Sequence, residues 1–502
     1  MDSSILSSLM LGDPCSPSFV RQVKARISAA ESNIARLDTQ DPELTRLRDQ
    51  ELELLAALKP LIAPIRKLPV ELLTEIFLLI VDSMGDWLTH ALLVSQICAH
   101  WRRVACATPQ LWNREIALNL TKPRSDAYLA TTKTFFERSE PLSIPVVLDK
   151  EPTEASSLAK YIYGLAPRWK SLSWTDCASS RLQALPVRAL NSLESVVIFH
   201  CSDVPSSSPV DVFLGVQSLR AVTLDVWSME CFRIPWSQLT SLIITEDPEE
   251  EEPPKPAQLF LDILLQCANV VDVHFFNVIP WIEAPAFSTP STQLPRLQEL
   301  TVLFAGSHSG GEDATPFFSQ LALPALTSLC VFSDSVTWWS PADFSQFQRR
   351  SPNVEELHLM GISLTSDGVA SLLAEYPHLV DIQLEDCFEN NSAALGSALD
   401  LLTYNDTTTP TVPRLRRLKI EDRQVHSVGE ATWERMIFSR WWKDPQMEPH
   451  SGVRLEALAI SNDGGDDDEA EFSAPFVAKM EQLRAEGLQV TITECFLTIV
   501  GP

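Results

Sequence analysis

An apolar triplet recurs along the C-terminal part of the chain and is its most regular pattern. Each copy has an apolar residue, two variable residues, a second apolar residue, one variable residue and a third apolar residue, and most copies begin 20 to 31 residues apart. The alternation at the end of each copy predicts a short strand with one buried face, because successive side chains of a strand point to opposite sides. The copies are Trp169/Leu172/Trp174, Leu193/Val196/Ile198, Leu219/Val222/Leu224, Leu239/Leu242/Ile244, Val270/Val273/Phe275, Leu297/Leu300/Val302, Leu326/Leu329/Val331, Val354/Leu357/Leu359, Leu379/Ile382/Leu384, Leu415/Leu418/Ile420 and Leu455/Leu458/Ile460, with Val490/Ile492 as a terminal strand.

Repeats of this length cannot bury their apolar side chains alone, so we expect them to stack into one curved parallel sheet. Segments between the copies, such as Asp367–Glu375, carry apolar residues at helical spacing and are expected to pack behind the strands. The pattern resembles that of leucine-rich repeats. Cys177, Cys201 and Cys387 each follow a copy by three positions, where that repeat family places an inward Asn or Cys, so these thiols are expected to be structural.

Residues 64–112 carry a second pattern, which has helical periodicity. It predicts a first helix that has Pro69 in its first turn, where a missing N–H costs little, and a second helix over Gln96–Ala105. A segment of about fifty residues makes only a small core, so the excess of large apolar residues indicates that one face is meant for a partner. The apolar positions of the first helix are Leu68, Leu72, Ile76, Phe77 and Ile80.

Five short motifs follow one another within this segment. They are Leu68-Pro69-Val70-Glu71-Leu72-Leu73, Glu75-Ile76-Phe77, Val94-Ser95-Gln96-Ile97-Cys98, Trp101-Arg102 and Pro109-Gln110-Leu111-Trp112. In this order and spacing they resemble an F-box, which implies that the helices dock on the Skp adaptor of a cullin-based ubiquitin ligase. Some of the matching residues must instead form the internal core, and the sequence does not divide the two sets. The adaptor-binding candidates implied are Leu68, Pro69, Leu72, Ile76, Phe77, Ile97, Trp101, Leu111 and Trp112.

The N-terminal region predicts two further helices. Apolar stripes run along Phe19–Leu37 and along Leu44–Leu61, and Asp41-Pro42 makes a turn between them. Such a pair forms a helical hairpin or a short coiled-coil arm, which either packs on its own chain or mediates self-association through residues 19–61. We therefore expect a mixed α+β and α/β protein with three domains: a hairpin over 1–62, a three-helix F-box over 63–118, and a leucine-rich-repeat solenoid with a curved parallel sheet over 119–502.

Charge and composition narrow the choice of partners. The chain has 502 residues and a formal net charge of −27, which argues against nucleic acid as the main partner because phosphate binding needs clustered Lys and Arg. The sequence contains no stretch of about twenty uninterrupted apolar residues, so no membrane span is predicted. The ten cysteines are scattered without a CxxC pair, which is typical of free thiols in the cytoplasm or nucleus. Acidic runs at Glu249–Glu252 and Asp466–Glu469 are expected to be solvated loops.

The sequence carries no catalytic pattern. The nine histidines form no HExxH arrangement, and neither a phosphate-binding GxxxxGK[ST] loop nor a GxGxxG motif after a strand occurs. Gly306-Ser307-His308-Ser309-Gly310 has His308 where a nucleophile elbow needs serine. We therefore expect a protein that is not an enzyme and has no cofactor and no metal site.

The exposed positions of the predicted strands suggest where a protein substrate would bind. In the middle and later copies they carry a mixture of aromatic, Met and charged side chains, which suits recognition of a protein segment. The substrate-binding candidates are Asp272, His274, Phe276, Glu356, His358, Met360, Asp381, Gln383, Glu385, Arg417 and Lys419.

Together these features resemble F-box/leucine-rich-repeat proteins, in a form abundant in mushroom-type fungi. The resemblance implies a substrate receptor of a Skp–cullin–F-box ubiquitin ligase, in which the F-box binds the Skp adaptor and, through it, a cullin, while the repeats hold an unknown protein substrate. The alternative is a repeat scaffold in which the F-box-like helices cap the solenoid and have no role in ubiquitin transfer.

Overall fold

The structure, a computed structural model, separates into two compact units, residues 1–172 and residues 173–502. The three predicted domain boundaries stay predictions, because this division is coarser than they are. No helix in the described part of the chain is long and apolar enough to cross a membrane. The described residues are 17–37, 42–82, 86–119, 126–150, 157–177, 179–185, 190–201, 209–246, 254–279, 292–305, 314–337, 340–388, 391–405, 410–442, 452–462, 471–494 and 497–499, and the acidic runs and the Gly306–Gly310 loop lie outside them.

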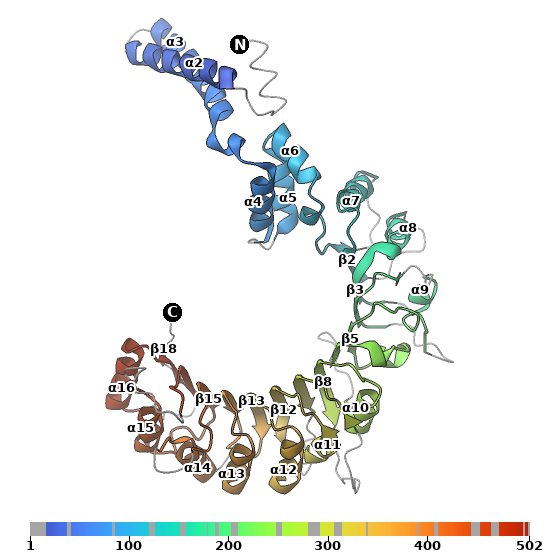
Figure 1. The fold of residues 1–502 in the computed structure, drawn as a ribbon, viewed down its shortest axis with the longest axis vertical. Coiled ribbons are helices and arrows are strands. Elements are labelled where there is room, and N and C mark those ends of the chain that lie inside the picture. Colours follow the sequence, from blue (N-terminus) through green and yellow to red (C-terminus); the bar gives the residue numbers. More distant parts are fainter. Residues whose placement is uncertain are drawn as a thin grey trace. The chain divides into compact units, whose positions relative to one another are not determined.

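The first unit begins with the predicted pair of helices, α2 (Pro17–Arg36) and α3 (Pro42–Leu58), followed by the short turn η1 (Lys59–Ile62) (Figure 1). The two helices pack on each other. Their apolar stripes close a small core made of Val23, Ile27, Ala30, Leu55 and Leu58. The predicted helical hairpin is confirmed.

Three helices follow, flanked by short turns at both ends. Asp86 begins α5 by accepting a hydrogen bond from the Thr89 amide, and Cys98 begins α6 in the same way with the Trp101 amide. The single helix predicted over Gln96–Ala105 is wrong, because the extended backbone of Cys98 (φ −156°, ψ 168°) separates α5 from α6. These elements are η2 (Pro64–Lys67), α4 (Val70–Asp82), α5 (Trp87–Gln96), α6 (Ala99–Cys106) and η3 (Pro109–Leu111).

The first unit ends with elements that the triplet pattern did not predict. Strands β1 (Ala117–Asn119) and β2 (Ile144–Lys150) pair in parallel, and α7 (Asp126–Arg138) connects them. After α8 (Ser157–Gly164) and η4 (Ala166–Arg168), strand β3 (Trp169–Thr175) begins the predicted repeats. The Arg168 side chain ties the end of α7 to the loop after it, donating to the carbonyl oxygens of Phe136 and Leu142.

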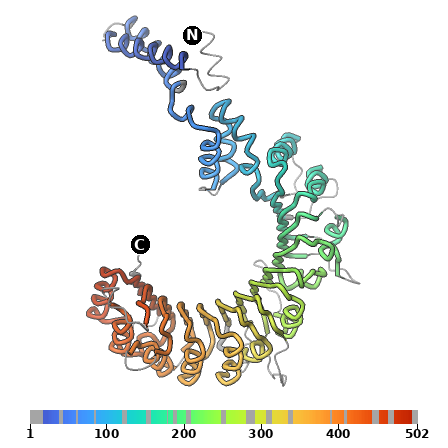
Figure 2. Tube along the Cα trace, viewed as in Figure 1, coloured from blue at the N-terminus to red at the C-terminus, as the bar shows by residue number. Residues whose placement is uncertain are grey.

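The second unit is built on the predicted parallel sheet, with strands arranged in chain order (Figure 2). The apolar residues of the predicted triplets are buried throughout this unit, which confirms the repeat solenoid. A short strand, β18 (Leu497–Ile499), pairs antiparallel with the last parallel strand. The parallel strands are β4 (Ser195–Phe199), β5 (Ala221–Asp225), β6 (Ser241–Thr245), β8 (Asp272–Ile279), β10 (Glu299–Phe304), β12 (Ser328–Thr337), β13 (Glu356–Ile362), β14 (Asp381–Glu385), β15 (Arg417–Glu421), β16 (Ala457–Ser461) and β17 (Gln489–Glu494).

Helices cover the outer side of this sheet, and the strands line the inner side of its curve (Figure 1). The predicted helix over Asp367–Glu375 is confirmed as α13, which buries Val369, Leu372 and Leu373. The helices of this unit are α9 (Ser179–Gln183), α10 (Ala257–Leu264), α11 (Thr315–Ser319), α12 (Pro341–Arg350), α13 (Ser366–Glu375), α14 (Ser392–Leu402), α15 (Glu430–Ser439) and α16 (Ala474–Ala485). The minor elements are η6 (Ser228–Cys231), η7 (Trp236–Gln238), β7 (Lys255–Pro256), β9 (Thr292–Gln293) and β11 (Leu321–Ala322).

A left-handed backbone residue recurs two positions after the last apolar residue of a triplet. Only Gly adopts this conformation freely, and Asn, Asp and His tolerate it better than other residues. The next residue turns inward, which is why Cys177, Cys201 and Cys387 are buried as predicted. The left-handed residues are Asp176, His200, Asn277, Gly361 and Asp386, with φ between 49° and 67°.

Candidate functional site

The three-helix bundle of α4, α5 and α6 has a closed interior. Leu73, Phe77 and Val81 lie one helical turn apart on α4 and are buried in a cluster that also contains Trp112 and, from α7, Phe135. The Trp112 indole donates a 2.8 Å hydrogen bond to the Ala105 carbonyl oxygen, so the polar atom of this buried ring is satisfied. The bundle therefore does not need its outer apolar residues for its own core.

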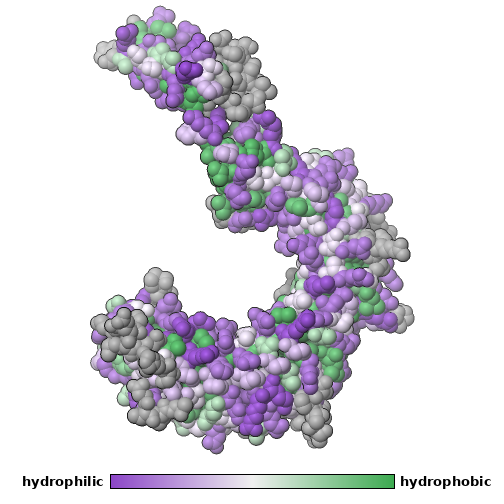
Figure 3. All heavy atoms as spheres, in the orientation of Figure 1, coloured by the Kyte–Doolittle hydropathy of each residue, from purple (hydrophilic) through white to green (hydrophobic). Residues whose placement is uncertain are grey.

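A second stripe on the same helices faces solvent. On α4, Leu72 is 50% exposed and Leu79 is 67% exposed. Leu93 on α5 and Ile97, which directly follows α5, are each 54% exposed. Apolar side chains gather visibly over this bundle in the space-filling view (Figure 3). Isolated exposed leucines are ordinary, whereas several large apolar side chains exposed on one small bundle make it a candidate interaction face. We call Leu72, Leu79, Leu93 and Ile97 the apolar stripe.

The structure divides the predicted adaptor-binding residues into two sets. Phe77, Leu111 and Trp112 are buried core residues, so their predicted contact with an adaptor is corrected: side chains without exposed surface cannot touch a partner. Leu68, Ile76 and Trp101 are half-buried and pack against the core, whereas Pro69, Leu72 and Ile97 are exposed. Leu79 and Leu93 were missed, although Leu79 follows Leu72 at a spacing of seven, which places both on one helical face.

The predicted substrate-binding residues all lie on the inner side of the second unit's sheet, on β8, β13, β14 and β15. The register places Glu356, Asp381 and Arg417 in one row across three neighbouring strands. His358, Gln383 and Lys419 form the next row, and Met360 and Glu385 lie opposite each other in a third. Asp272, His274 and Phe276 are separated from these rows by β10 and β12. The prediction that they bind a substrate stays a prediction.

Ion pairs hold the basic residues of these rows. Arg417 Nε lies 2.5 Å from Asp381 Oδ2, and Lys419 Nζ lies 2.7 Å from Glu385 Oε1 and 2.8 Å from Glu421 Oε2. Because both cations are about a third to a half exposed, each pair adds only about 0–1 kcal/mol to stability. Their main effect is to fix both side chains toward β14.

The two histidines of this face differ electrostatically. Contact with the Asp272 carboxylate raises the pKa of His274 and outweighs the lowering by burial. Nε2 of His274 lies 2.8 Å from Asp272 Oδ1, and this contact favours the protonated ring. For His358 burial is the larger influence and lowers its pKa, although Glu385 Oε1 lies 3.0 Å from its Nε2.

Asp272, His274 and Glu299 place their ligand atoms within 4.8 Å of one another, so one nitrogen and two carboxylate oxygens are close enough to hold a metal ion. The imidazole and the Asp272 carboxylate already neutralise each other in this arrangement. We assign no metal to it. The buried thiols are poor nucleophiles, since burial raises the pKa of Cys267 to about 12.

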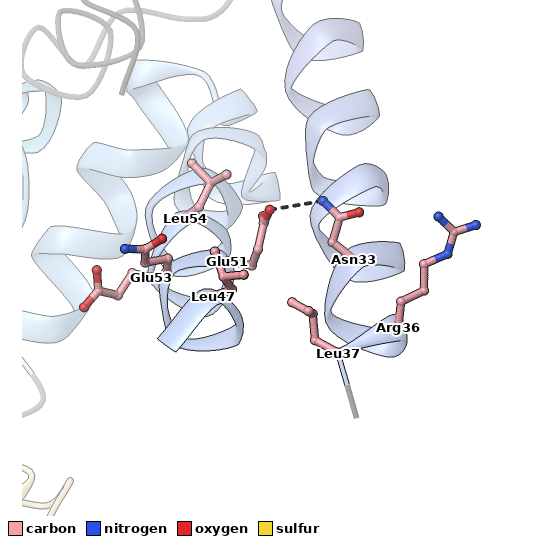
Figure 4. A pocket seen from close by; sticks show the side chains of 8 residues that line it. Asn33, Arg36, Leu37, Leu47, Glu51, Glu53 and Leu54 are labelled. Carbon is pink, nitrogen blue, oxygen red and sulfur yellow. Dashed lines mark hydrogen bonds between the residues drawn. The ribbon is translucent and has the colours of Figure 1, made fainter. Parts of the chain in front are cut away.

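The N-terminal hairpin carries a groove of about 710 Å³ between α2 and α3 (Figure 4). Leu37, Leu47 and Leu54 line it, and a 3.1 Å hydrogen bond from Asn33 to Glu51 crosses it. Arg36 and Glu53 lie at its rim in the close-up view (Figure 4). The groove is therefore apolar at its base and charged at its edge.

No known family profile and no curated protein matches this chain. The chain is similar to a number of solved structures, including the following two. An internalin from Listeria monocytogenes is 11% identical, with 62% of this chain and 82% of that chain covered and a TM-score of 0.30. A structure of the Rad7 and Elc1 complex in yeast is 13% identical, with 90% of this chain and 98% of that chain covered and a TM-score of 0.31. Both TM-scores lie below 0.5, so neither similarity assigns a function or a partner.

Proposed function

We propose that this chain is a substrate receptor of a Skp–cullin–F-box ubiquitin ligase. The observation that carries the proposal is the apolar stripe, which lies on a bundle that already has a closed core. The bundle coincides with the motifs that resemble an F-box, and a repeat sheet with a patterned face follows it. The stripe would bind the Skp adaptor and, through it, a cullin.

In this role the chain does no bond chemistry of its own. It works in the cytoplasm or nucleus and raises the local concentration of substrate lysines near a charged ubiquitin-conjugating enzyme. The sequence resemblance to a form abundant in mushroom-type fungi makes a fungal Skp protein the first adaptor to test.

The first prediction tests adaptor binding with the full chain. Leu72→Asp and Leu79→Asp are expected to abolish co-purification with a Skp-type adaptor, because each would bury an unpaired charge at a desolvated interface, at a cost of about 3–5 kcal/mol. Their melting temperatures should stay close to that of the native chain, since both side chains are exposed. Pull-down and differential scanning fluorimetry measure the two quantities.

The matched control is Leu265→Asp, which places the same charge at a residue that is 53% exposed in the second unit and should leave adaptor binding unchanged. Phe77→Asp is unsuitable as a test, because a charge in the closed core would unfold the bundle. Adaptor binding that survives both stripe substitutions would contradict the proposal.

The groove of the hairpin favours a second activity, self-association through residues 19–61. Its five-residue core is small for two helices, and a second copy of the hairpin would cover the leucines that line the groove. A symmetric pair would make every contact across the groove twice, because a two-fold interface pairs residues reciprocally.

Sedimentation velocity of the full chain tests this proposal. Leu47→Glu, which changes a groove residue, is expected to shift the protein from dimer to monomer. Leu52→Glu is the control, because Leu52 has almost the same exposure (44% against 46%) and does not line the groove. A native chain that sediments as a monomer at every concentration would refute self-association.

A further inference from the structure

The inner face of the second unit carries two contrasting rows of side chains over β8, β10, β12 and β13. The first row begins each strand and contains Asp272, Glu299, Ser328 and Glu356, which the register places side by side. Three of these four residues are carboxylates. The row therefore presents negative charge along one edge of the face.

The second row lies four residues further along the same strands and is apolar. Leu303, Phe332 and Met360 lie side by side and are half-buried. Phe276 joins them on β8, where a shift in register places it near Leu303. Four residues of extended chain span about 13 Å, so the acidic and apolar rows are separated by about that distance.

Within the first row Asp272 is paired with His274, whereas the charges of Glu299 and Glu356 are not fully cancelled within the face. The Glu299 side chain makes no ion pair or hydrogen bond among the described residues and is exposed, and its carboxylate lies near the His274 ring. Glu356 is 55% exposed, and its ion pair is a 3.4 Å approach to Arg417, which Asp381 already holds at 2.5 Å. Arg417 and Lys419 are thus already paired with carboxylates of β14 and β15. The part of the face formed by β8 to β13 therefore keeps a negative charge.

We call the position between Glu299 and Glu356 the notch. The strand between them, β12, carries the small residues Ser328 and Cys330 on this side, and two strand spacings put the flanking backbones about 9.6 Å apart. Burial is the main cause that raises the pKa of the Cys330 thiol, and the carboxylates of Glu356 and Glu299 raise it further. Phe332 closes the notch toward the apolar row and packs edge-on against His358, with ring centroids 4.6 Å apart.

We propose that this face binds an extended segment of a partner protein in which a basic residue and a large apolar residue lie four positions apart. The Arg or Lys enters the notch above Ser328 and Cys330, between Glu299 and Glu356. The apolar side chain packs on Phe332 and Met360. The inference rests on the proposed function and deepens it, because it states the chemistry of the segment that a substrate would offer.

Charge complementarity is what selects this partner. An acidic segment would place like charges against Glu299 and Glu356, whereas a guanidinium between two carboxylates makes charge-assisted hydrogen bonds. An extended segment matches the face because its side chains at i and i+4 lie on one side, separated by about the distance between the two rows.

Fluorescence anisotropy with the full chain tests the inference. The probe is a labelled peptide pool with Arg and Leu fixed four positions apart in a Gly/Ser/Thr background, compared with pools in which Arg becomes Glu or Leu becomes Ser. The Arg/Leu pool is expected to bind about tenfold or more tightly than either comparison pool. Its binding should weaken as NaCl rises from about 50 to about 500 mM, because the carboxylates are exposed.

Substitutions locate the site. Glu299→Gln combined with Glu356→Gln should weaken binding of the Arg/Leu pool about tenfold, whereas Glu355→Gln, which removes the same charge one residue from Glu356, should leave it unchanged. Met360→Ser should reduce binding of the Arg/Leu pool and leave the affinity for the Leu-to-Ser pool unaltered. Circular dichroism checks that each variant is folded.

Two results would overturn the inference: equal affinity for the Arg and Glu pools, or native affinity in the folded double Gln variant. The peptide-binding test and the adaptor-binding test can fail independently. Adaptor binding is tested with Leu72→Asp, which lies outside this face. Adaptor binding without peptide selectivity overturns only the inference, and peptide selectivity without adaptor binding overturns only the ligase role.

Discussion

At the scale of single residues, the turn after each strand is held by backbone conformation. Gly361 occupies the left-handed position near the end of β13 with φ of 67°, and a Cβ there would overlap the carbonyl oxygen of Ser333 on the neighbouring strand. Asp, Asn and His fill the same position in other repeats. The triplet pattern describes only which side chains are buried. It therefore did not predict that these residues adopt a left-handed backbone conformation.

Gly361→Ala is expected to destabilise the second unit by about 1–3 kcal/mol, because Ala is strained in this conformation and its methyl group meets backbone. Gly396→Ala is the matched control: Gly396 lies within α14 and has open space around it, so the change should stabilise by about 0.5–1 kcal/mol. Urea-induced unfolding measures both. Equal effects of the two substitutions would show that the turn is not strained.

The two inner-face histidines provide a prediction about pH. His274 should titrate above the ordinary value of 6.5 and His358 below it, so that at pH 6.5 His274 is mostly protonated and His358 mostly neutral. Histidine NMR signals followed from pH 5 to 8 give the order. In Asp272→Asn the pKa of His274 should fall, because burial then acts without the opposing carboxylate. An unchanged His274 titration in this variant would refute the assigned cause.

At the scale of elements, the sequence predicted what depends on periodic burial. The repeated strands and α13 follow from alternation and helical spacing, because their buried faces are continuous. Strands β1 and β2 were missed because they lack the triplet. The break at Cys98 was missed because apolar positions continue at helical spacing across it. The feature that separates the two helices is local: Cys98 has an extended backbone, and its side chain accepts a hydrogen bond from the Trp101 amide at the start of α6.

Buried carboxylates connect one repeat to the next, and they were also missed. Asp422 is 1% exposed and accepts hydrogen bonds from the amides of Phe388 (2.7 Å) and Gln424 (2.8 Å). Asp225 holds the amides of His200 and Ser228 in the same way. Acidic residues are mostly exposed, so nothing in the sequence indicated a buried one. The structure of the turns shows this role.

Asp422→Ala should destabilise the second unit by about 2–4 kcal/mol, because two amide donors lose their acceptor. Asp422→Asn keeps one carbonyl oxygen at the site and should cost roughly half as much or less. Thermal and urea unfolding of the two variants compare these costs. Equal costs of Asn and Ala would mean that charge, and not hydrogen bonding, governs the position, because both substitutions remove the charge.

At the scale of the whole molecule, the long parallel strands of the second unit follow one another across the sheet in chain order, and the short strands β7, β9 and β11 lie outside this order. Stability in such an array is close to a sum of local and neighbour contributions, so its ends open more easily than its middle.

The candidate sites could be predicted from the sequence only in part. Strand alternation indicated which residues face inward, but the acidic and apolar rows depend on register between strands, which no single repeat encodes.

Hydrogen exchange should therefore be graded along the second unit. Amides of β10 to β14 are expected to be the most protected, and protection should fall toward β4 and β17, because the central strands have paired neighbours on both sides over more repeats. Mass spectrometry of peptic fragments measures this gradient. Uniform protection from end to end would show that the unit opens as one cooperative block.

The apolar stripe has a consequence for how much of the protein a cell keeps. A chain that shows four large apolar side chains in the absence of its partner exposes the kind of surface that chaperones and proteases recognise and that promotes aggregation. Its soluble amount is then set by the supply of the partner and not only by its own synthesis. Co-expression with a protein that covers the stripe should raise the recovered yield, and Leu79→Asp should raise the yield of the chain expressed alone.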